Sequence, residues 1–145
     1  MFGVSARAAI LAIALAMCCD FARPAAAQSA AEVEAFCQKA SSPEEKATCM
    51  TQRLQITDAE LKRVYRLVLA SIDAKVERPI VHRRDWRRAV QEAQRHWRAW
   101  VIQDCRAVVG WEMSGAPSLA AASAACELER VASRIVELRG RYGVK

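Results

Sequence analysis

The 145-residue sequence has few of the features from which active sites and membrane spans are usually built. It contains only two histidines, His82 and His96, and no glycine-rich phosphate loop. Neither histidine stands with a carboxylate in a pattern that indicates a metal or nucleophile site, and we interpret His82 and Asp85 as a surface pair. No later segment is apolar for the roughly 20 residues that a bilayer-spanning helix needs. We therefore predict a protein that is not an enzyme, needs no cofactor or metal, and has no transmembrane segment beyond its N-terminal leader.

The N-terminus follows the pattern of a secretory signal peptide. Arg7 precedes an apolar run over residues 8–19, and Pro24 with three alanines follows, so we expect cleavage after Ala27. Residues 28–145 then form a single domain, which is long enough to bury about two-thirds of its unfolded surface. We expect this domain in the periplasm or outside the cell.

The chain has six cysteines. Cys18 and Cys19 leave with the signal peptide, unless one of them carries a lipid anchor, an alternative that the residues before them fit less well. The other four are an even set, which in an oxidising compartment indicates disulfides: Cys37, Cys49, Cys105 and Cys126. We favour neighbouring pairs, the first with the second and the third with the fourth, because each closes a short loop and stabilises by about 3 kcal/mol. Zinc binding is the alternative, but the chain has no Cys-x2-Cys spacing.

Apolar periodicity predicts helices along the chain and no strands. We expect a short helix over residues 31–39, and a second one that starts at a capping box formed by Ser42, Pro43 and Glu45. Thr57 and Glu60 repeat the capping signal, so this second helix either breaks at Thr57 or continues as one long helix. It ends before Pro79 and carries the apolar stripe Leu61, Val64, Tyr65, Val68, Ile72 and Val76.

Two more helices are expected, one over residues 84–109 and one with a final apolar stripe. That stripe consists of Leu128, Val131, Ile135, Leu138 and Tyr142. The predicted fold class is an all-α, disulfide-bonded, up-and-down bundle of about three main helices plus one or two short N-terminal helices.

The helix over residues 84–109 has two contrasting faces. Its tryptophan face extends to the following loop and consists of Trp86, Trp97, Trp100 and Trp111. We expect it to be core rather than a ligand groove, with Trp111 partly exposed. The opposite, arginine face consists of Arg84, Arg87, Arg88, Arg95, Arg98 and Arg106. It is either a solvated surface or a site for anionic groups, since guanidinium binds carboxylate and phosphate. The tryptophans point away from the arginines, so nucleic acid is not an expected partner.

The order and spacing of the cysteines and several other residues resemble the N-terminal domain of LprI-type lysozyme inhibitors, an exported bacterial family formerly of unknown function. The resemblance spans residues 37–138 and includes a Gln-x-x-Trp motif. It involves Cys37, Ala40, Glu45, Cys49, Leu54, Asp58, Leu61, Tyr65, Gln94, Trp97, Cys105, Cys126, Arg134 and Leu138. An Arg-Asp pair expected after the tryptophan is replaced by Val101 and Ile102. The resemblance implies a helical, disulfide-bonded, non-enzymatic protein of the periplasm or cell surface, with a lysozyme or another envelope protein as its partner.

Two hypotheses for the function follow. The first is inhibition of lysozyme by occlusion of its cleft, which holds two catalytic carboxylates. Two loops qualify as the inhibitory element: residues 77–84, with His82, Arg83 and Arg84, and residues 110–117, with Trp111, Met113 and Ser114. The second is an envelope-binding or structural module whose arginine face binds anionic lipid or glycan. Loss of residues 1–27 removes two basic residues and one acidic residue and leaves a net charge of +5, which favours anionic partners in general.

Asp104 falls on the tryptophan side of its helix, where a carboxylate needs a partner. We predict that Arg134, from another helix, pairs with it.

Overall fold

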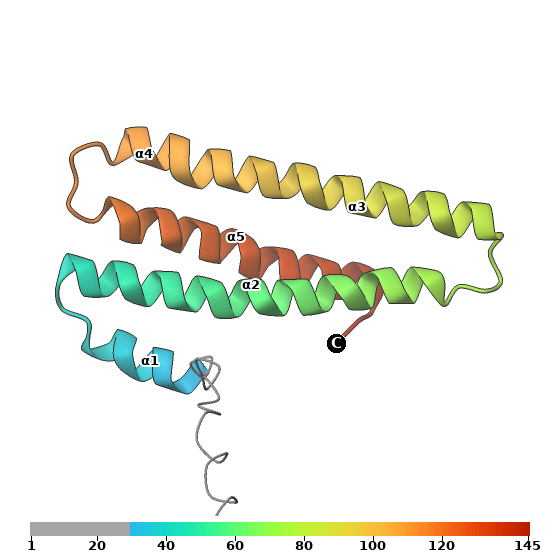
Figure 1. The fold of residues 1–145 in the computed structure, drawn as a ribbon, viewed down its shortest axis with the longest axis horizontal. Helices are drawn as coiled ribbons and strands as arrows, with labels where there is room; N and C mark the ends of the chain where they lie inside the picture. The colour runs from blue at the N-terminus through green and yellow to red at the C-terminus, as the bar shows by residue number, and fades with distance from the viewer. Residues whose placement is uncertain (1–29) are drawn as a thin grey trace, which may run out of the picture.

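The computed structural model describes residues 30–145, so the predicted signal peptide with Cys18 and Cys19 lies outside the described residues. It consists of helices α1 (Ala30–Lys39), α2 (Pro43–Asp73), α3 (Ile80–Ile102), α4 (Val109–Glu112) and α5 (Leu119–Tyr142), with a π-helical segment η1 (Gln103–Val108) between α3 and α4. The described part contains no strand. Successive long helices run in opposite directions, with α2 and α5 side by side and α3 alongside them (Figure 1). The predicted all-α, up-and-down bundle is confirmed.

Helix α2 begins where the local sequence predicts and then continues past the second capping signal. The Ser42 hydroxyl accepts a hydrogen bond from the Glu45 backbone N–H, and the Glu45 carboxylate accepts one from the Ser42 N–H. Of the two alternatives at Thr57, the single long helix is the one formed. The Thr57 hydroxyl donates to the Arg53 carbonyl at 2.9 Å, so this side chain is satisfied inside the helix instead of capping a new one.

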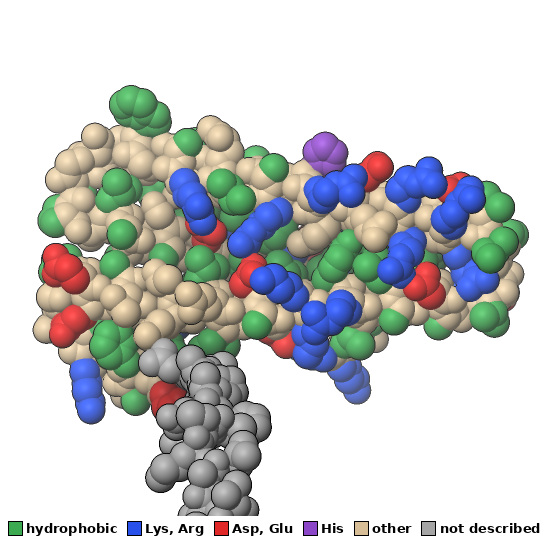
Figure 2. All heavy atoms as spheres, in the orientation of Figure 1, with side chains coloured by type: hydrophobic (Ala, Val, Ile, Leu, Met, Phe, Trp, Pro, Cys, Tyr) green, Lys and Arg blue, Asp and Glu red, His purple; other side chains and the backbone are tan. Residues whose placement is uncertain are grey.

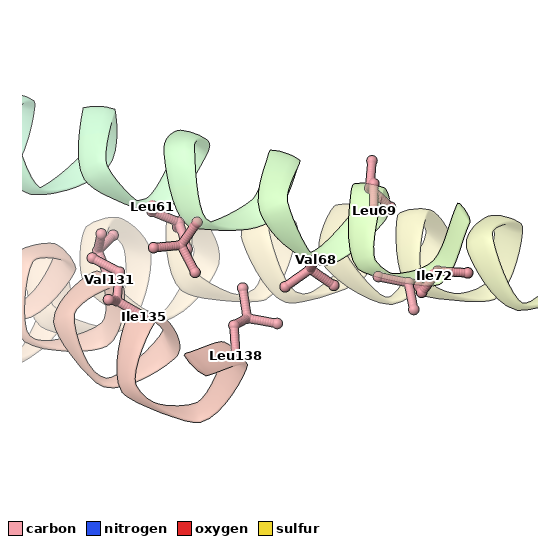
Figure 3. Close-up of a cluster of buried hydrophobic side chains, with 9 residues drawn as sticks. Leu61, Val68, Leu69, Ile72, Val131, Ile135 and Leu138 are labelled. Carbon is pink, nitrogen blue, oxygen red and sulfur yellow. The ribbon is translucent and has the colours of Figure 1, made fainter. Parts of the chain in front are cut away.

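The core lies mainly between α2 and α5 (Figure 3). Buried side chains meet there from α2 (Leu61, Val64, Val68, Leu69, Ile72) and from α5 (Val131, Ile135, Leu138), with Val90 of α3 beside them. The larger side chains of Tyr65, Trp86, Trp97 and Tyr142 pack against this cluster and attach α3 to it. Val76 does not belong to the stripe as predicted, because α2 ends at Asp73 and leaves Val76 80% exposed in the turn that follows.

The helix predicted over residues 84–109 starts earlier and changes type. Helix α3 begins at Ile80, and after Ile102 the chain forms one wide π-helical turn. Because a π-helix has more residues per turn, side chains after Ile102 point in other directions than a straight α-helix predicts. The tryptophan face is therefore core only in part. Trp86 and Trp97 pack on the core, whereas Trp100, at the edge of the face, is 49% exposed and Trp111 is 83% exposed.

Both predicted disulfides are formed. Cys37 pairs with Cys49 and ties α1 to α2, and Cys105 pairs with Cys126 and ties η1 to α5. The Cα atoms of the pairs are 5.1 and 5.5 Å apart, which is usual for disulfides.

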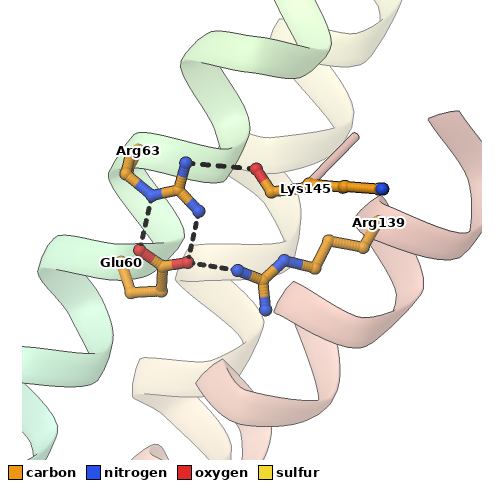
Figure 4. Close-up of polar contacts among 4 residues, drawn as sticks. All are labelled: Glu60, Arg63, Arg139 and Lys145. Carbon is orange, nitrogen blue, oxygen red and sulfur yellow. Dashed lines mark hydrogen bonds and ion pairs between the residues drawn. The ribbon is translucent and has the colours of Figure 1, made fainter. Parts of the chain in front are cut away.

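A polar network that the sequence analysis did not find joins the C-terminus to α2 (Figure 4). Arg63 and Arg139 both donate to the Glu60 carboxylate, and Arg63 also donates to the Lys145 carbonyl at 3.1 Å. The hydrogen bonds from Arg63, aided by the charges of Arg63 and Arg139, lower the pKa of Glu60. Since Glu60 and Arg139 are far apart in the sequence, no local pattern indicates this pairing.

Candidate functional site

The turn between α2 and α3 forms a protruding end of the molecule. Helices α2 and α3 extend past the last turn of α5, so the end of this hairpin has no third helix beside it (Figure 1). We call residues 73–88 the hairpin tip. Val76 (80%), Ile80 (74%) and Val81 (54%) expose their apolar side chains there. Solvent-exposed apolar side chains clustered at one end are typical of a contact surface.

The hairpin tip is also rich in positive charge. It contains three acidic residues against six basic ones: Lys75, Arg78, Arg83, Arg84, Arg87 and Arg88. Among the described residues, no acidic partner pairs with the side chains of Lys75, Arg78 or Arg83. Basic and apolar side chains are seen together at this end in Figure 2. The tip thus offers cations that the protein itself does not neutralise.

The predicted loop over residues 77–84 is shorter than expected. The connection is residues 74–79, and His82, Arg83 and Arg84 belong to the first turns of α3. This correction makes the base of the tip a rigid element. Arg83 donates to the Asp73 carbonyl at 2.6 Å, and Arg87 pairs with the Asp73 carboxylate.

A hollow of about 750 Å3 lies along the α3 side of the tip. It is lined by Arg78, Val81, His82, Asp85, Trp86 and Ala89. The Trp86 ring packs between two other rings. Its centroid lies 6.3 Å from that of Tyr142, at the end of α5, and 6.2 Å from that of His82. His82 therefore contacts a tryptophan ring, and it is Arg84 and Arg88 that pair with Asp85.

The arginine face carries less uncompensated charge than its sequence indicates. Each of its six arginines lies within 4 Å of a carboxylate of the same chain. The pairs are Arg84 and Arg88 with Asp85, Arg87 with Asp73, Arg95 with Glu92, Arg98 with Asp58, and Arg106 with Glu127. Exposed pairs of this kind contribute little stability, but they lower the attraction of the face for external anions.

The second predicted loop, over residues 110–117, is shorter than expected, because Trp111 belongs to α4 and the connection to α5 is residues 113–118. Trp111 is 83% exposed, which confirms its expected exposure, and Ser114 is exposed beside it. Gly115 lies in the turn with φ at 80°, a conformation that glycine adopts without steric cost. Glu112, the last residue of α4, is the one charged residue among residues 110–117, so this region lacks the cations of the hairpin tip.

The residues of the Gln-x-x-Trp motif make contacts between the helices of the bundle. The Gln94 side-chain oxygen accepts a hydrogen bond from Arg134 Nε at 3.2 Å, and the Arg134 guanidinium lies 5.5 Å from the Trp97 ring centroid. Asp58 pairs with Lys62 and Arg98, at 3.0 and 3.2 Å. Leu138 is in the core, and Tyr65 packs against it. These positions connect α3 to α2 and α5.

Asp104 pairs with a different arginine from the one predicted. Its carboxylate accepts a hydrogen bond from Arg130 at 3.2 Å, whereas Arg134 bonds to Gln94 and Glu137. Asp104 lies in the π-helical turn, which changes its direction, so it meets the arginine one turn earlier on α5.

Two further classes of site were searched for in the described part of the chain. Its one group of potential metal ligands is Asp104, Cys105 and Cys126, whose two sulfur atoms are joined in a disulfide. None of its helices is both long and apolar enough to cross a bilayer.

These features define a small, all-helical, disulfide-bonded protein with a protruding basic hairpin. The chain belongs to the family described as Lysozyme inhibitor LprI, which matches residues 37–138. The matched range includes all four disulfide cysteines, the hairpin tip and the Gln-x-x-Trp motif. No curated protein and no solved structure matches the chain.

Proposed function

We propose that the protein is an exported lysozyme inhibitor that acts by inserting its hairpin tip into the substrate cleft of the enzyme. Membership of the LprI family supports lysozyme as the partner. Two disulfides in a small domain suit an oxidising compartment, and the periplasm or the exterior is the location that we propose. The observation that carries the proposal is the tip, which protrudes past α5 and combines exposed apolar side chains with cations that lack acidic partners.

The chemistry of the tip suits a glycosidase cleft. Lysozyme catalyses with two carboxyl groups that flank the scissile bond, so the floor of its cleft is acidic. Arg78 can offer paired N–H donors to a carboxylate, and Lys75 adds a second positive charge beside it. Val76, Ile80 and Val81 then lose solvent exposure against the cleft walls, which contributes the non-directional part of the binding energy.

The alternative, an envelope-binding module that uses the arginine face on anionic lipid or glycan, has less support. Four of the six arginines of that face lie 3.4 Å or less from a carboxylate of the same protein, whereas Arg88 and Arg95 lie 3.9 and 3.8 Å from one. Lipid or glycan would have to compete with these carboxylates for the arginines. The carboxylates have the advantage, because they belong to the same chain and lose no translational freedom when they pair.

The test is inhibition by charge-reversed variants of the oxidised protein. The variant Lys75→Glu with Arg78→Glu changes the charge of the tip by −4, and we expect it to weaken inhibition at least tenfold. The matched control is Lys39→Glu with Lys46→Glu, which makes the same change in net charge where α1 meets α2, at the opposite end of the molecule. It should weaken inhibition less than threefold.

Inhibition is measured as residual lysis of cell walls by lysozymes of different net charge, at low and at physiological salt. Saturable inhibition that persists in salt and depends on the tip supports the proposal. Equal loss in both charge-reversed variants would refute insertion of the tip, since it would show a response to net charge only. Loss with Trp111→Ser, with the tip variant still active, would instead place the contact at α4 and the connection to α5.

A further inference from the structure

A second hollow runs along the seam between α2 and α3. We call it the α2–α3 groove; it measures about 620 Å3 and is lined by Asp58, Leu61, Lys62 and Tyr65 of α2 and by Gln91, Gln94, Arg95 and Arg98 of α3. Both sets have the spacing i, i+3, i+4, i+7, so each is one stripe of its helix, about 10 Å long. Basic side chains line this seam from both sides in Figure 2.

The two ends of the groove differ in how closely their charged side chains are paired within the protein. At one end, Asp58 is paired with both Lys62 and Arg98. At the other end lie Tyr65, Gln91 and Arg95. Among the described residues, neither the Tyr65 hydroxyl nor the Gln91 amide has a hydrogen-bond partner, and both groups are open to solvent at the ends of partly buried side chains. Arg95 has one acidic neighbour, Glu92, at 3.8 Å, beyond hydrogen-bond distance.

The unsatisfied end is a positive environment. Burial raises the pKa of the Tyr65 phenol, and the charges of Arg87 and Arg95 offset part of that rise. The side-chain oxygen of Gln94, which also lines the groove, accepts a hydrogen bond from Arg134 and leaves the amide nitrogen as a further donor. Partly buried donors without partners are normally satisfied by water or by a ligand. The donors here outnumber the acceptors, so the groove favours a ligand that is rich in oxygen and negatively charged.

We propose that this end of the α2–α3 groove binds a sugar acid, with its carboxylate on Arg95 and its hydroxyl groups on Gln91 and Tyr65. Guanidinium binds carboxylate through two parallel N–H bonds. A glutamine amide and a tyrosine hydroxyl each donate and accept, as vicinal sugar hydroxyls require. Leu61 is the only aliphatic side chain of the lining and is itself buried, so the lining offers little apolar surface to an acyl chain.

The experiment is titration of the oxidised protein with digalacturonate, followed by calorimetry and by two-dimensional NMR. We expect saturable binding, with shifts concentrated at Tyr65, Gln91 and Arg95. Arg95→Ala should weaken binding at least tenfold, and Gln91→Ala or Tyr65→Phe about threefold to tenfold. Arg88→Ala is the matched control, an exposed arginine of the same helix outside the groove, and should leave the affinity unchanged.

Three outcomes would overturn the proposal. The first is no saturation with digalacturonate at millimolar concentration by a protein whose NMR spectrum is that of the folded state. The second is equal affinity for citrate, which would show that a carboxylate alone suffices and that the hydroxyl contacts do not form. The third is unchanged affinity in Arg95→Ala. The groove lies outside the hairpin tip, so lysozyme inhibition by Arg95→Ala tests the proposed function separately.

Discussion

The contacts of Arg134 with Gln94 and Trp97 predict that the variant Arg134→Ala is much less stable to unfolding than the parent protein. The guanidinium is only 10% exposed, donates to the Gln94 oxygen, pairs with Glu137 and lies over the Trp97 ring. A hydrogen bond that involves a charged group contributes about 1.5–3 kcal/mol, and a partly desolvated cation–π contact about 1 kcal/mol. We therefore expect Arg134→Ala to lower the free energy of unfolding by about 3 kcal/mol.

The assay is urea unfolding of the oxidised protein, followed by helical circular dichroism. With a slope of about 1.5–2 kcal/mol per molar urea, the midpoint should fall by roughly 1.5–2 M. Arg141→Ala is the control on the same helix. Its side chain is 65% exposed and lies 3.7 Å from Glu137, so its loss should cost about 0.3–0.5 kcal/mol. If both variants shift the midpoint equally, the reasoning about the Gln-x-x-Trp motif is wrong.

Two further predictions concern the ends of the bundle. Replacing Cys105 and Cys126 together by serine should cost about 3 kcal/mol in urea unfolding, because that disulfide closes a 21-residue separation; an unchanged midpoint would contradict this. Backbone hydrogen bonds from Ser42 and Ser41 lower the pKa of Glu45, so its contribution is present above the pKa of the unfolded chain, about 4.3, and is lost as pH falls through the lower folded pKa. Unfolding midpoints at pH 7 and pH 3 should therefore differ less in Glu45→Gln than in the parent, and an equal difference would contradict this.

Local signals predicted the parts of the fold that depend on neighbouring residues. The capping box at Ser42 acts over three positions, and the structure forms it as predicted. The second signal, at Thr57, is local too, but burial decides against it. Leu54 before it and Leu61 after it pack on the same core, so a break between them would remove one of the two from that core. Where a local capping signal and the burial of apolar side chains favour different structures, the sequence pattern alone does not show which contributes more free energy.

The geometry after Ile102 could not be predicted, since no propensity distinguishes a π-helical turn from an α-helical one. This one turn accounts for the wrong partner of Asp104. It also moves Trp111 away from the face on which a straight helix would place it. By contrast, the disulfide between Cys105 and Cys126 was predicted correctly, because loop length does not depend on the direction of a helix face.

The sequence named several arginines that the structure places at the hairpin tip, but it could not show which of their charges are paired. Arg83 and Arg84 of the loop hypothesis lie in the first turns of α3 within the hairpin tip, next to Arg87 and Arg88 of the arginine face. The sequence could not show which cations are neutralised, because their partners include a distant carboxylate, as in the pair of Arg98 with Asp58. Lys75 and Arg78 were not singled out by any motif. They become candidates only once the ion pairs of their neighbours are known.

Under the proposed function, this distribution of paired and unpaired charge bears on how a basic protein would bind a lysozyme that is also basic. Repulsion between two net positive charges acts at long range and falls within about 8 Å at physiological salt. A contact between Arg78 and a cleft carboxylate acts at hydrogen-bond distance in a site from which water is excluded, so salt weakens it much less. Lys75, Arg78 and Arg83 of the tip have no acidic partner among the described residues, so under the proposed function they are the cations that would attract an acidic part of the lysozyme surface. In the proposed complex, net charge would limit the rate of association, whereas contacts of the tip would determine the lifetime.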